Sequence, residues 1–323
     1  MAKDLEIQIP WLRYDITVPL IEGRVSIEGV TLVPTRAAPN GTVFGQDSPL
    51  KTGEFGLVDL NMANWIPAIE AGWELVGLPV FPKRKHLYTY LFCRSDAGIA
   101  TVKDLEGKRV LSSITSSAVG IWWHYLLEKR HGVDLGRITW ISPREQWPIH
   151  GWRWKMEPLA GRKSAVEVLL DGDADAIMVD ISDRKLSQAL ENDPRIKRLF
   201  PDYLGEAKRF HEESGILPPV HMIVMSRKLD REFPELAGKL VAAFDQAKQQ
   251  GYGDILDDRS GLGVIDLRER FLAQQSAWGD LFPHGLAANR RTLDAFITHC
   301  REHGLVKSDI GYDRLLAAST LAT

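Results

Sequence analysis

The chain has 323 residues, of which 44% are hydrophobic and 26% charged, a composition typical of a globular protein and a length that favours two lobes over one core. Its formal net charge is −3, from 40 basic and 43 acidic residues, and no basic tract suits nucleic acid or an anionic membrane. Cys93 and Cys300 are the two cysteines, too few for a four-ligand zinc site.

The first residues, 1–7, contain no apolar h-region of a signal peptide. No apolar run approaches the ~18–20 residues that a membrane-spanning helix needs. We therefore expect a cytoplasmic protein that binds neither membrane nor nucleic acid.

Strand patterns alternate with helix patterns along the chain, which predicts an α/β protein with a largely parallel sheet. In the first third we expect a helix at 64–70, an extended segment at 87–93, and strands at 5–9, 30–33, 55–60 and 74–81. In the middle we expect helices at 118–130 and 165–170, and strands at 107–111, 138–141 and 176–180. Another apolar run lies at 220–226, and the chain is chiefly helical from Pro234 onward.

Several motifs together resemble known families. Similarity to the second lobe of type 2 solute-binding proteins is seen in TVKDLEGKRV (101–110) and DGDADAIMVD (171–180). Similarity to the 4,5-dihydroxyphthalate decarboxylase family, a cytoplasmic branch of that fold, is seen in PVFPKR (79–84), RSDAGI (94–99), RLFPDY (198–203), SGILPPVHMIVMSRKL (214–229) and LFPHGLAANRRTLDAFITHCREHGL (281–305). This resemblance runs from about residue 14 to about residue 310.

The resemblance implies an α/β, two-lobed, type 2 periplasmic-binding-protein-like fold with a ligand cleft between the lobes. It places residues 1–90 and 222–323 in lobe one and residues 91–221 in lobe two.

Two motifs depart from the family pattern. Leu87 and Tyr88 stand where the family usually has an Arg-His pair, and the family's YDRTR reads YDITV at 14–18, without either arginine. We therefore expect a substrate less anionic than dihydroxyphthalate.

Polar residues that follow strands are candidates for substrate binding, because ligands of open α/β sheets bind beyond the carboxyl ends of the strands. Arg84 follows one such strand, and a guanidinium can hold a carboxylate through two parallel hydrogen bonds. Thr115, Ser116 and Ser117 precede a helix and offer hydroxyl and backbone N–H groups to the same anion. A solvated basic loop and simple helix capping are the respective alternatives.

Asp59 and Asn61 lie at the end of another predicted strand. His221 lies in the apolar run 220–226, which the resemblance makes the second crossover between the lobes, near the hinge and the cleft. We predict that these three residues bind substrate. For Asn61, capping of the next helix is the alternative.

The segment 143–158 gathers tryptophans, arginines and a histidine. We predict that Trp152 and Arg153 belong to the wall of a pocket for an aromatic ligand, by stacking and by pairing with carboxylates. Ordinary packing of an irregular segment is the alternative.

Three residues are candidates for proton transfer: His86, His150 and Asp180. Histidine titrates near neutral pH and acts readily as a general acid or base. Asp180 closes a buried strand, where an acid must be hydrogen-bonded, paired or placed at a cleft. Capping of a following helix is the alternative for Asp180.

The resemblance implies a cofactor-independent decarboxylase that acts on a small aromatic or cyclic carboxylic acid. Because HxH, HExxH, CxxC and Gly-rich phosphate motifs are missing, we expect no cofactor, and leave a divalent metal and a homo-oligomer open. A non-enzymatic solute-binding protein of an ABC-type uptake system, or a cytoplasmic sensor, is the competing hypothesis, since one fold serves many functions. A dehydratase on the same fold is a third.

Overall fold

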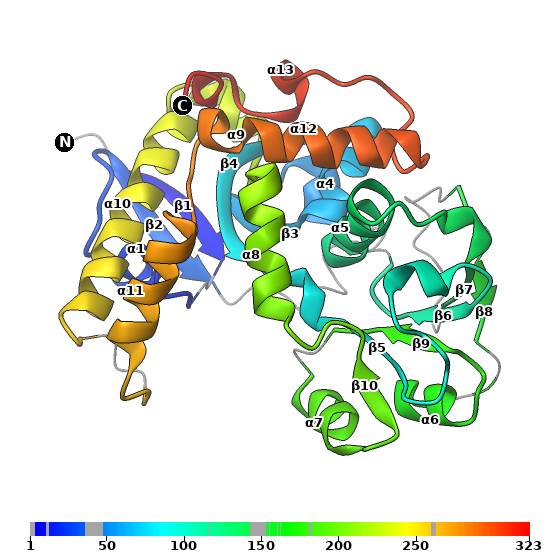
Figure 1. Ribbon diagram of the computed structural model, residues 1–323. Helices are drawn as coiled ribbons and strands as arrows, with labels where there is room; N and C mark the ends of the chain where they lie inside the picture. The colour runs from blue at the N-terminus through cyan, green and yellow to red at the C-terminus, as the bar shows by residue number, and fades with distance from the viewer. Residues whose placement is uncertain are drawn as a thin grey trace. The chain divides into compact units, whose positions relative to one another are not determined.

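The computed structural model describes residues 4–10, 13–35, 48–115, 117–142, 153–154, 156–159, 161, 163–180, 183–259 and 263–323 (Figure 1). The chain divides into two compact units. Unit 1 comprises Met1–Arg84, Pro219–Leu293 and Ser308–Thr323, and unit 2 comprises Lys85–Pro218 and Asp294–Lys307. Within the described residues, no helix has both the length and the apolar character needed to cross a membrane.

Unit 1 contains two small sheets. β1 (Leu5–Pro10) pairs in parallel with β2 (Val30–Thr35). In the other sheet, β11 (Pro219–Ser226) lies between β3 (Leu57–Asn61) and β4 (Leu75–Arg84) and is antiparallel to both. The apolar faces of β1, β4 and β11 form one core with the long helix α10 (Leu236–Leu256), seen in yellow beside β1 and β2 in Figure 1.

The other helices of unit 1 are mostly short. They are α1 (Val18–Ile21), α3 (Pro49–Thr52), α4 (Met62–Glu70), α9 (Arg227–Glu232), α11 (Leu267–Trp278), α13 (Tyr312–Leu315) and the 3-10 turn η5 (Ala318–Thr320). The helix α12 (Leu286–Glu302) begins in unit 1, and its residues from Asp294 onward belong to unit 2.

Unit 2 is built on a six-stranded mixed sheet. Its strands follow the order β10 (Ile196–Arg198), β5 (Leu91–Arg94), β9 (Ala176–Met178), β6 (Arg109–Ser112), β7 (Thr139–Ser142) and β8 (Met156–Pro158). The last four pair in parallel, whereas β5 is antiparallel to both of its neighbours.

The helical segments of unit 2 connect these strands. They are η1 (Leu87–Thr89), η2 (Val102–Leu105), α5 (Ala118–Tyr125), which continues as the π-helical turn η3 (Leu126–Arg130), η4 (Leu135–Arg137), α6 (Ala165–Leu170), α7 (Arg184–Asn192) and α8 (Tyr203–Ser214). Ile177 and Val179 of the strand region pack with Leu111 and Val168 in the core of this unit.

Two details differ from the sequence-based expectations. The prediction of a largely parallel sheet holds for β9-β6-β7-β8 and for β1-β2, but β11 enters its sheet as an antiparallel central strand. The segment 87–93 is not extended throughout, because Leu87–Thr89 form a 3-10 turn closed by the Tyr90 N–H on the Leu87 carbonyl. The predicted lobe boundaries stay a prediction.

Candidate functional site

Asp59 and His221 form a hydrogen-bonded pair in unit 1. Asp59 lies on β3 and His221 on β11, and the His221 Nδ1 atom is 3.0 Å from Asp59 Oδ2. Both side chains are mostly buried, with exposed fractions of 14% for His221 and 12% for Asp59. A carboxylate on Nδ1 orients the ring, which leaves Nε2 to exchange a proton with a ligand.

The strand register places further polar residues on the same sheet face as this pair. Opposite His221 stand Asn61 on β3 and Lys83 on β4, and directly opposed residues share a face. Asp59, two residues before Asn61, shares it too. The β4–β11 register shifts on both sides of His221, an irregularity that re-aims side chains and often occurs near active sites.

Tyr14 and Asn61 also contribute to this region. Burial, and then the charge of Asp59, raise the pKa of Tyr14 to about 12, so that its phenol is neutral at pH 7. The Asn61 Oδ1 atom accepts a hydrogen bond of 3.1 Å from the Ala63 N–H and caps α4. The capping alternative is therefore realised for Asn61, and its binding role stays a prediction.

The guanidinium of Arg84 forms hydrogen bonds with other residues of unit 1. It donates to Asn289 Oδ1 at 2.6 Å and to the Pro283 carbonyl at 3.3 Å, and it lies over the Phe81 ring. Burial lowers the pKa of Arg84 to about 10, so it remains a cation at pH 7. These contacts join the end of β4 to the region before α12, and the predicted carboxylate clamp stays a prediction.

The hydroxyls of Thr115 and Ser117, in the turn before α5, form hydrogen bonds with backbone groups of unit 2. Ser117 Oγ donates to the Ile114 carbonyl at 2.6 Å and accepts from the Gly120 N–H at 3.3 Å. Thr115 Oγ1 donates to the Ser112 carbonyl at 3.5 Å. Helix capping is therefore realised at Ser117, while substrate binding by this turn stays a prediction.

His86 and Asp180 also lie in unit 2. Lys85 Nζ is 3.6 Å from Asp180 Oδ1 and lies over the Tyr90 ring. Burial lowers the pKa of His86, which favours a neutral imidazole at pH 7. Asp180 is thus paired with a cation, and its proton-transfer role and that of His86 stay predictions.

The remaining predicted residues come from the turn at 115–117 and the segment 143–158. Ser116, His150 and Trp152 lie outside the described residues. Arg153 is exposed, and its backbone N–H donates to the His303 carbonyl at 3.1 Å.

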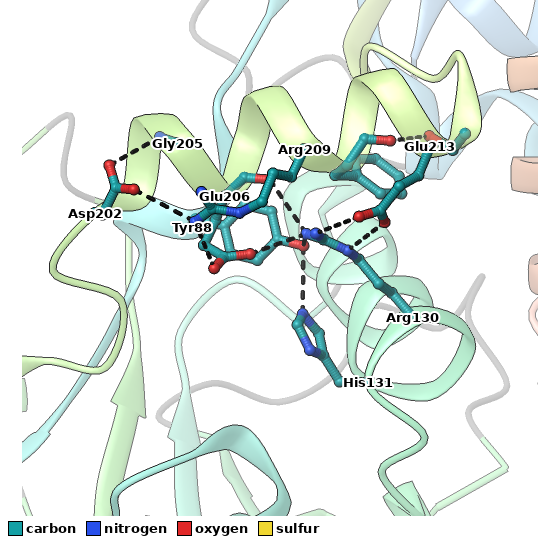
Figure 2. A network of polar contacts seen from close by, with 10 residues as sticks. Tyr88, Arg130, His131, Asp202, Gly205, Glu206, Arg209 and Glu213 are labelled. Atoms are coloured by element: carbon teal, nitrogen blue, oxygen red, sulfur yellow. Dashed lines mark hydrogen bonds and ion pairs between the residues drawn. The ribbon is translucent and has the colours of Figure 1, made fainter.

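A polar network around Tyr88 was missed by the sequence reading. Figure 2 shows Arg130, the last residue of η3, and His131, which follows it, directed toward the buried Tyr88 hydroxyl next to α8. The Arg130 guanidinium donates to this hydroxyl, and His131 Nε2 is 3.3 Å from it. Arg130 also pairs with Glu206 at 3.2 Å and with Glu213 at 3.0 Å.

This network places an arginine and a histidine beside the very residue where the family resemblance expects an Arg-His pair. Burial raises the pKa of Tyr88 to about 12, although its hydrogen bond with Arg130 lowers it, so the phenol is neutral at pH 7. The Tyr88 and Arg130 contact joins residues 42 positions apart in sequence, and local spacing gives no signal for it.

A hollow of about 370 Å³ in unit 1 contains none of the predicted residues. Arg24, one of the arginines that line it, pairs with Asp254 at 2.7 Å and with Glu22 at 3.2 Å. The charge of Arg24 is therefore already balanced by these carboxylates. The lining residues are Arg13, Asp15, Val18, Glu22, Arg24, Gly251, Asp254 and Arg259.

Comparison with known proteins gives a relative that spans the chain. No family model matches. The 4,5-dihydroxyphthalate decarboxylase of Comamonas testosteroni is 26% identical over 316 residues, covering 94% of each chain. This protein resembles 4,5-dihydroxyphthalate decarboxylase over nearly its whole length. The protein of that name from Pseudomonas putida is 27% identical over 124 residues, which are 38% of this chain and 47% of the relative. The resemblance predicted from the motifs is confirmed.

Solved structures identify the fold. The periplasmic aliphatic sulphonate binding protein SsuA from Escherichia coli has a TM-score of 0.54 at 17% identity, covering 98% of this chain and 92% of that one. A putative sulfonate-binding SsuA from Methylobacillus flagellatus has a TM-score of 0.61 at 12% identity, covering 99% and 93%. The desulfurization enzyme DSZB has a TM-score of 0.51 at 14% identity, covering 99% and 98%. The chain thus has the periplasmic-binding-protein fold, as predicted.

Proposed function

We propose that this protein is a cofactor-independent decarboxylase of a small aromatic or cyclic carboxylic acid, with His221 as the proton donor. Two observations support the proposal. The chain resembles a decarboxylase over 94% of its length. His221, whose Nδ1 atom is 3.0 Å from Asp59 Oδ2, lies inside the motif at 214–229, one of those that carry that resemblance. The pair is the observation on which the mechanism depends.

The chemistry needs one proton and a ring that accepts electrons. His221 in its protonated form gives a proton from Nε2 to the ring carbon that bears the carboxylate, and a ring hydroxyl becomes ketone-like. The bond from that carbon to the carboxylate then breaks, CO₂ leaves, and the electron pair restores the aromatic ring. Asp59 stabilises the imidazolium that must form before this transfer.

The neighbouring groups have supporting roles in this mechanism. Lys83, opposite His221 on the sheet, provides a positive charge for a substrate carboxylate or phenolate. The partly buried surroundings of the pair strengthen such electrostatic contacts. Because the hydroxylated ring itself holds the electrons, this sequence of steps requires no organic cofactor.

The test is an assay of CO₂ release by the purified chain, with hydroxylated aromatic mono- and dicarboxylates as substrates. We expect His221→Gln to lower kcat by about 10²–10⁴-fold, the usual effect of removing a general acid, and Asp59→Asn to lower kcat with a smaller effect on KM. His211→Gln, a histidine in the last turn of α8, is the matched control and should retain wild-type kcat. In D₂O the product should carry deuterium at the carbon that lost the carboxylate.

Two results would count against the proposal. Full turnover by a folded His221→Gln variant would remove this residue from the mechanism. Tight binding of carboxylates by the wild-type chain with no CO₂ release from any of them would reject the decarboxylase itself.

A ligand-binding protein is the second candidate, favoured by the fold similarity to two sulfonate-binding proteins with TM-scores of 0.54 and 0.61. It predicts that a sulfonate or carboxylate raises Tm by mass action while the ligand is recovered unchanged. Conversion of the ligand during the same incubation would exclude a purely binding role.

A further inference from the structure

Two histidines and two glutamates cluster in unit 2, and none of them is a predicted site residue. His299 lies on α12, and His303 follows one helical turn later, its N–H bonded to the His299 carbonyl at 3.2 Å. Glu128 comes from η3, and its Oε2 atom is 3.0 Å from His303 Nε2 and 3.7 Å from His299 Nδ1. With Glu302 included, one ligand atom from each residue lies within 4.8 Å of the others.

These distances suit a tetrahedral metal ion. Ligand atoms about 2.1 Å from zinc stand roughly 3.4 Å from one another, and the two separations from Glu128 are 3.0 and 3.7 Å. Two imidazoles and one carboxylate are a ligand set that zinc accepts, with a fourth position left for water or another carboxylate.

The sequence around this cluster has the spacing of a metal-binding helix. His299-Cys300-Arg301-Glu302-His303 reads H-x-x-E-H, which places both imidazoles on one helix face and is the reverse of the HExxH pattern. Glu128 precedes His299 by 171 positions, so only the fold brings the third ligand to them.

The burial of His299 is a second, independent observation. Its side chain is 0% exposed, and neither of its ring nitrogens has a hydrogen-bond partner among the described residues. Burying polar atoms without partners is costly, so each such group calls for an explanation. A metal ion bound to one of these nitrogens would supply the missing partner.

Aromatic rings surround the two imidazoles. The Tyr125 ring meets the His299 ring edge-on, with ring centroids 5.7 Å apart. The centroids of the Trp154 and His303 rings are 4.5 Å apart. An apolar shell of this kind excludes water and strengthens the bonds between a metal ion and its ligands.

The ammonium group of Lys129 would compete with a metal ion for the carboxylates of Glu128 and Glu302. Its Nζ atom is 3.1 Å from Glu128 Oε2 and 2.7 Å from Glu302 Oε2. A bound cation would replace Lys129 at Glu128, while Lys129 can keep its contact with Glu302. Removal of the lysine charge should therefore favour the metal.

We propose that Glu128, His299 and His303 form a binding site for a zinc ion, with Glu302 or water as the fourth ligand. The ion joins the end of α12 to η3, two segments far apart in sequence. It therefore stabilises unit 2 by binding the folded chain.

Metal binding by the full chain, freed of metal with EDTA and dialysed, tests this site. We expect about one Zn²⁺ per chain by calorimetry, and the absorption bands of tetrahedral Co²⁺ on titration with CoCl₂. His299→Gln and His303→Gln should each weaken zinc binding by at least about tenfold and remove the cobalt bands, while His211→Gln binds like the wild type. Lys129→Gln should bind zinc more tightly than the wild type.

The same titrations can overturn the site. Zinc binding of equal strength in folded His299→Gln and His303→Gln variants would place the ion elsewhere. No zinc binding by either the wild type or Lys129→Gln would reject the site and leave a buried histidine cluster with a packing role. Neither outcome depends on catalytic activity, so these titrations and the assay of CO₂ release test the zinc site and the proposed decarboxylase independently.

Discussion

The Tyr88 hydroxyl is the group that joins Arg130 and His131 in unit 2. Tyr88→Phe removes this hydroxyl but keeps the ring contacts with Trp123 and Phe200. Because buried polar partners then lose a hydrogen bond, we expect the free energy of unfolding to fall by about 1–2 kcal/mol, measured by urea denaturation. Tyr203→Phe is the control, since its hydroxyl has no hydrogen bond to the described residues. An equal loss in both variants would contradict the role given to Tyr88.

Residue chemistry could be predicted from the sequence more readily than residue pairing. In the sequence, Asp59 is a candidate at the end of a predicted strand and His221 is a candidate in an apolar run, but their hydrogen bond depends on the register of β3 against β11, across 162 positions. Arg84 is a candidate because it follows a predicted strand, and its bond to Asn289 spans 205 positions. No local pattern contains such contacts, because the tertiary fold alone creates them.

The two glycines near the end of α10 differ in their surroundings, although both lie inside the same helix. A Cβ atom at Gly251 would stand 2.2 Å from the Asp15 carbonyl oxygen, whereas one at Gly253 would meet nothing within 4 Å. We expect Gly251→Ala to lower the free energy of unfolding by about 2–3 kcal/mol through this overlap. Gly253→Ala should raise it by about 0.5–1 kcal/mol, since alanine is the better helix former.

Denaturation of the two alanine variants under the same conditions measures the difference. Each is the control of the other, because the helix and the substitution are shared. A loss of similar size in both would show that the approach of α10 to the Asp15 backbone does not limit residue size at position 251.

Elements were predictable where their signals are local. The helix 165–170 was predicted with its observed bounds because Ser164 and Glu167 form a capping box before it, and Gly172, at φ 81°, lies in the turn after it. The strands β8 and β10 were missed because each has three residues of mixed polarity, MEP and IKR. The equally short β9 was predicted because its residues, AIM, are all apolar and buried. The 3-10 turn at Leu87–Thr89 was likewise hidden in an apolar run that favoured an extended segment.

At the scale of the whole molecule, the family motifs determined the prediction better than the alternation of strands and helices did. The alternation alone predicted a largely parallel sheet, and the three-stranded antiparallel sheet β3-β11-β4 contradicts that for unit 1. The motifs spread over the chain implied the periplasmic-binding-protein fold, because they mark particular turns and strand ends instead of a general pattern.

Acid should destabilise the whole chain through histidines that burial keeps neutral. Burial lowers the pKa of His124 to about 3, and the pKa of His284 to about 3, from the ordinary value of 6.5 that the unfolded chain retains. Below pH 6.5 the unfolded chain therefore binds protons that the folded chain does not, and stability falls as the pH falls from 6.5 toward 3. The contribution of both histidines is fully present above pH 6.5.

Each of these histidines lowers the free energy of unfolding by about 1.4 kcal/mol per pH unit in that window. We expect a loss of at least about 2 kcal/mol between pH 7.5 and 5.5, measured by urea denaturation at both values. In His284→Gln, whose side chain can still accept the hydrogen bond that the Phe81 N–H gives to His284 at 3.5 Å, the loss should be smaller by about 1 kcal/mol. An unchanged difference between the two pH values in this variant would mean that His284 takes up its proton in the folded chain as readily as in the unfolded one.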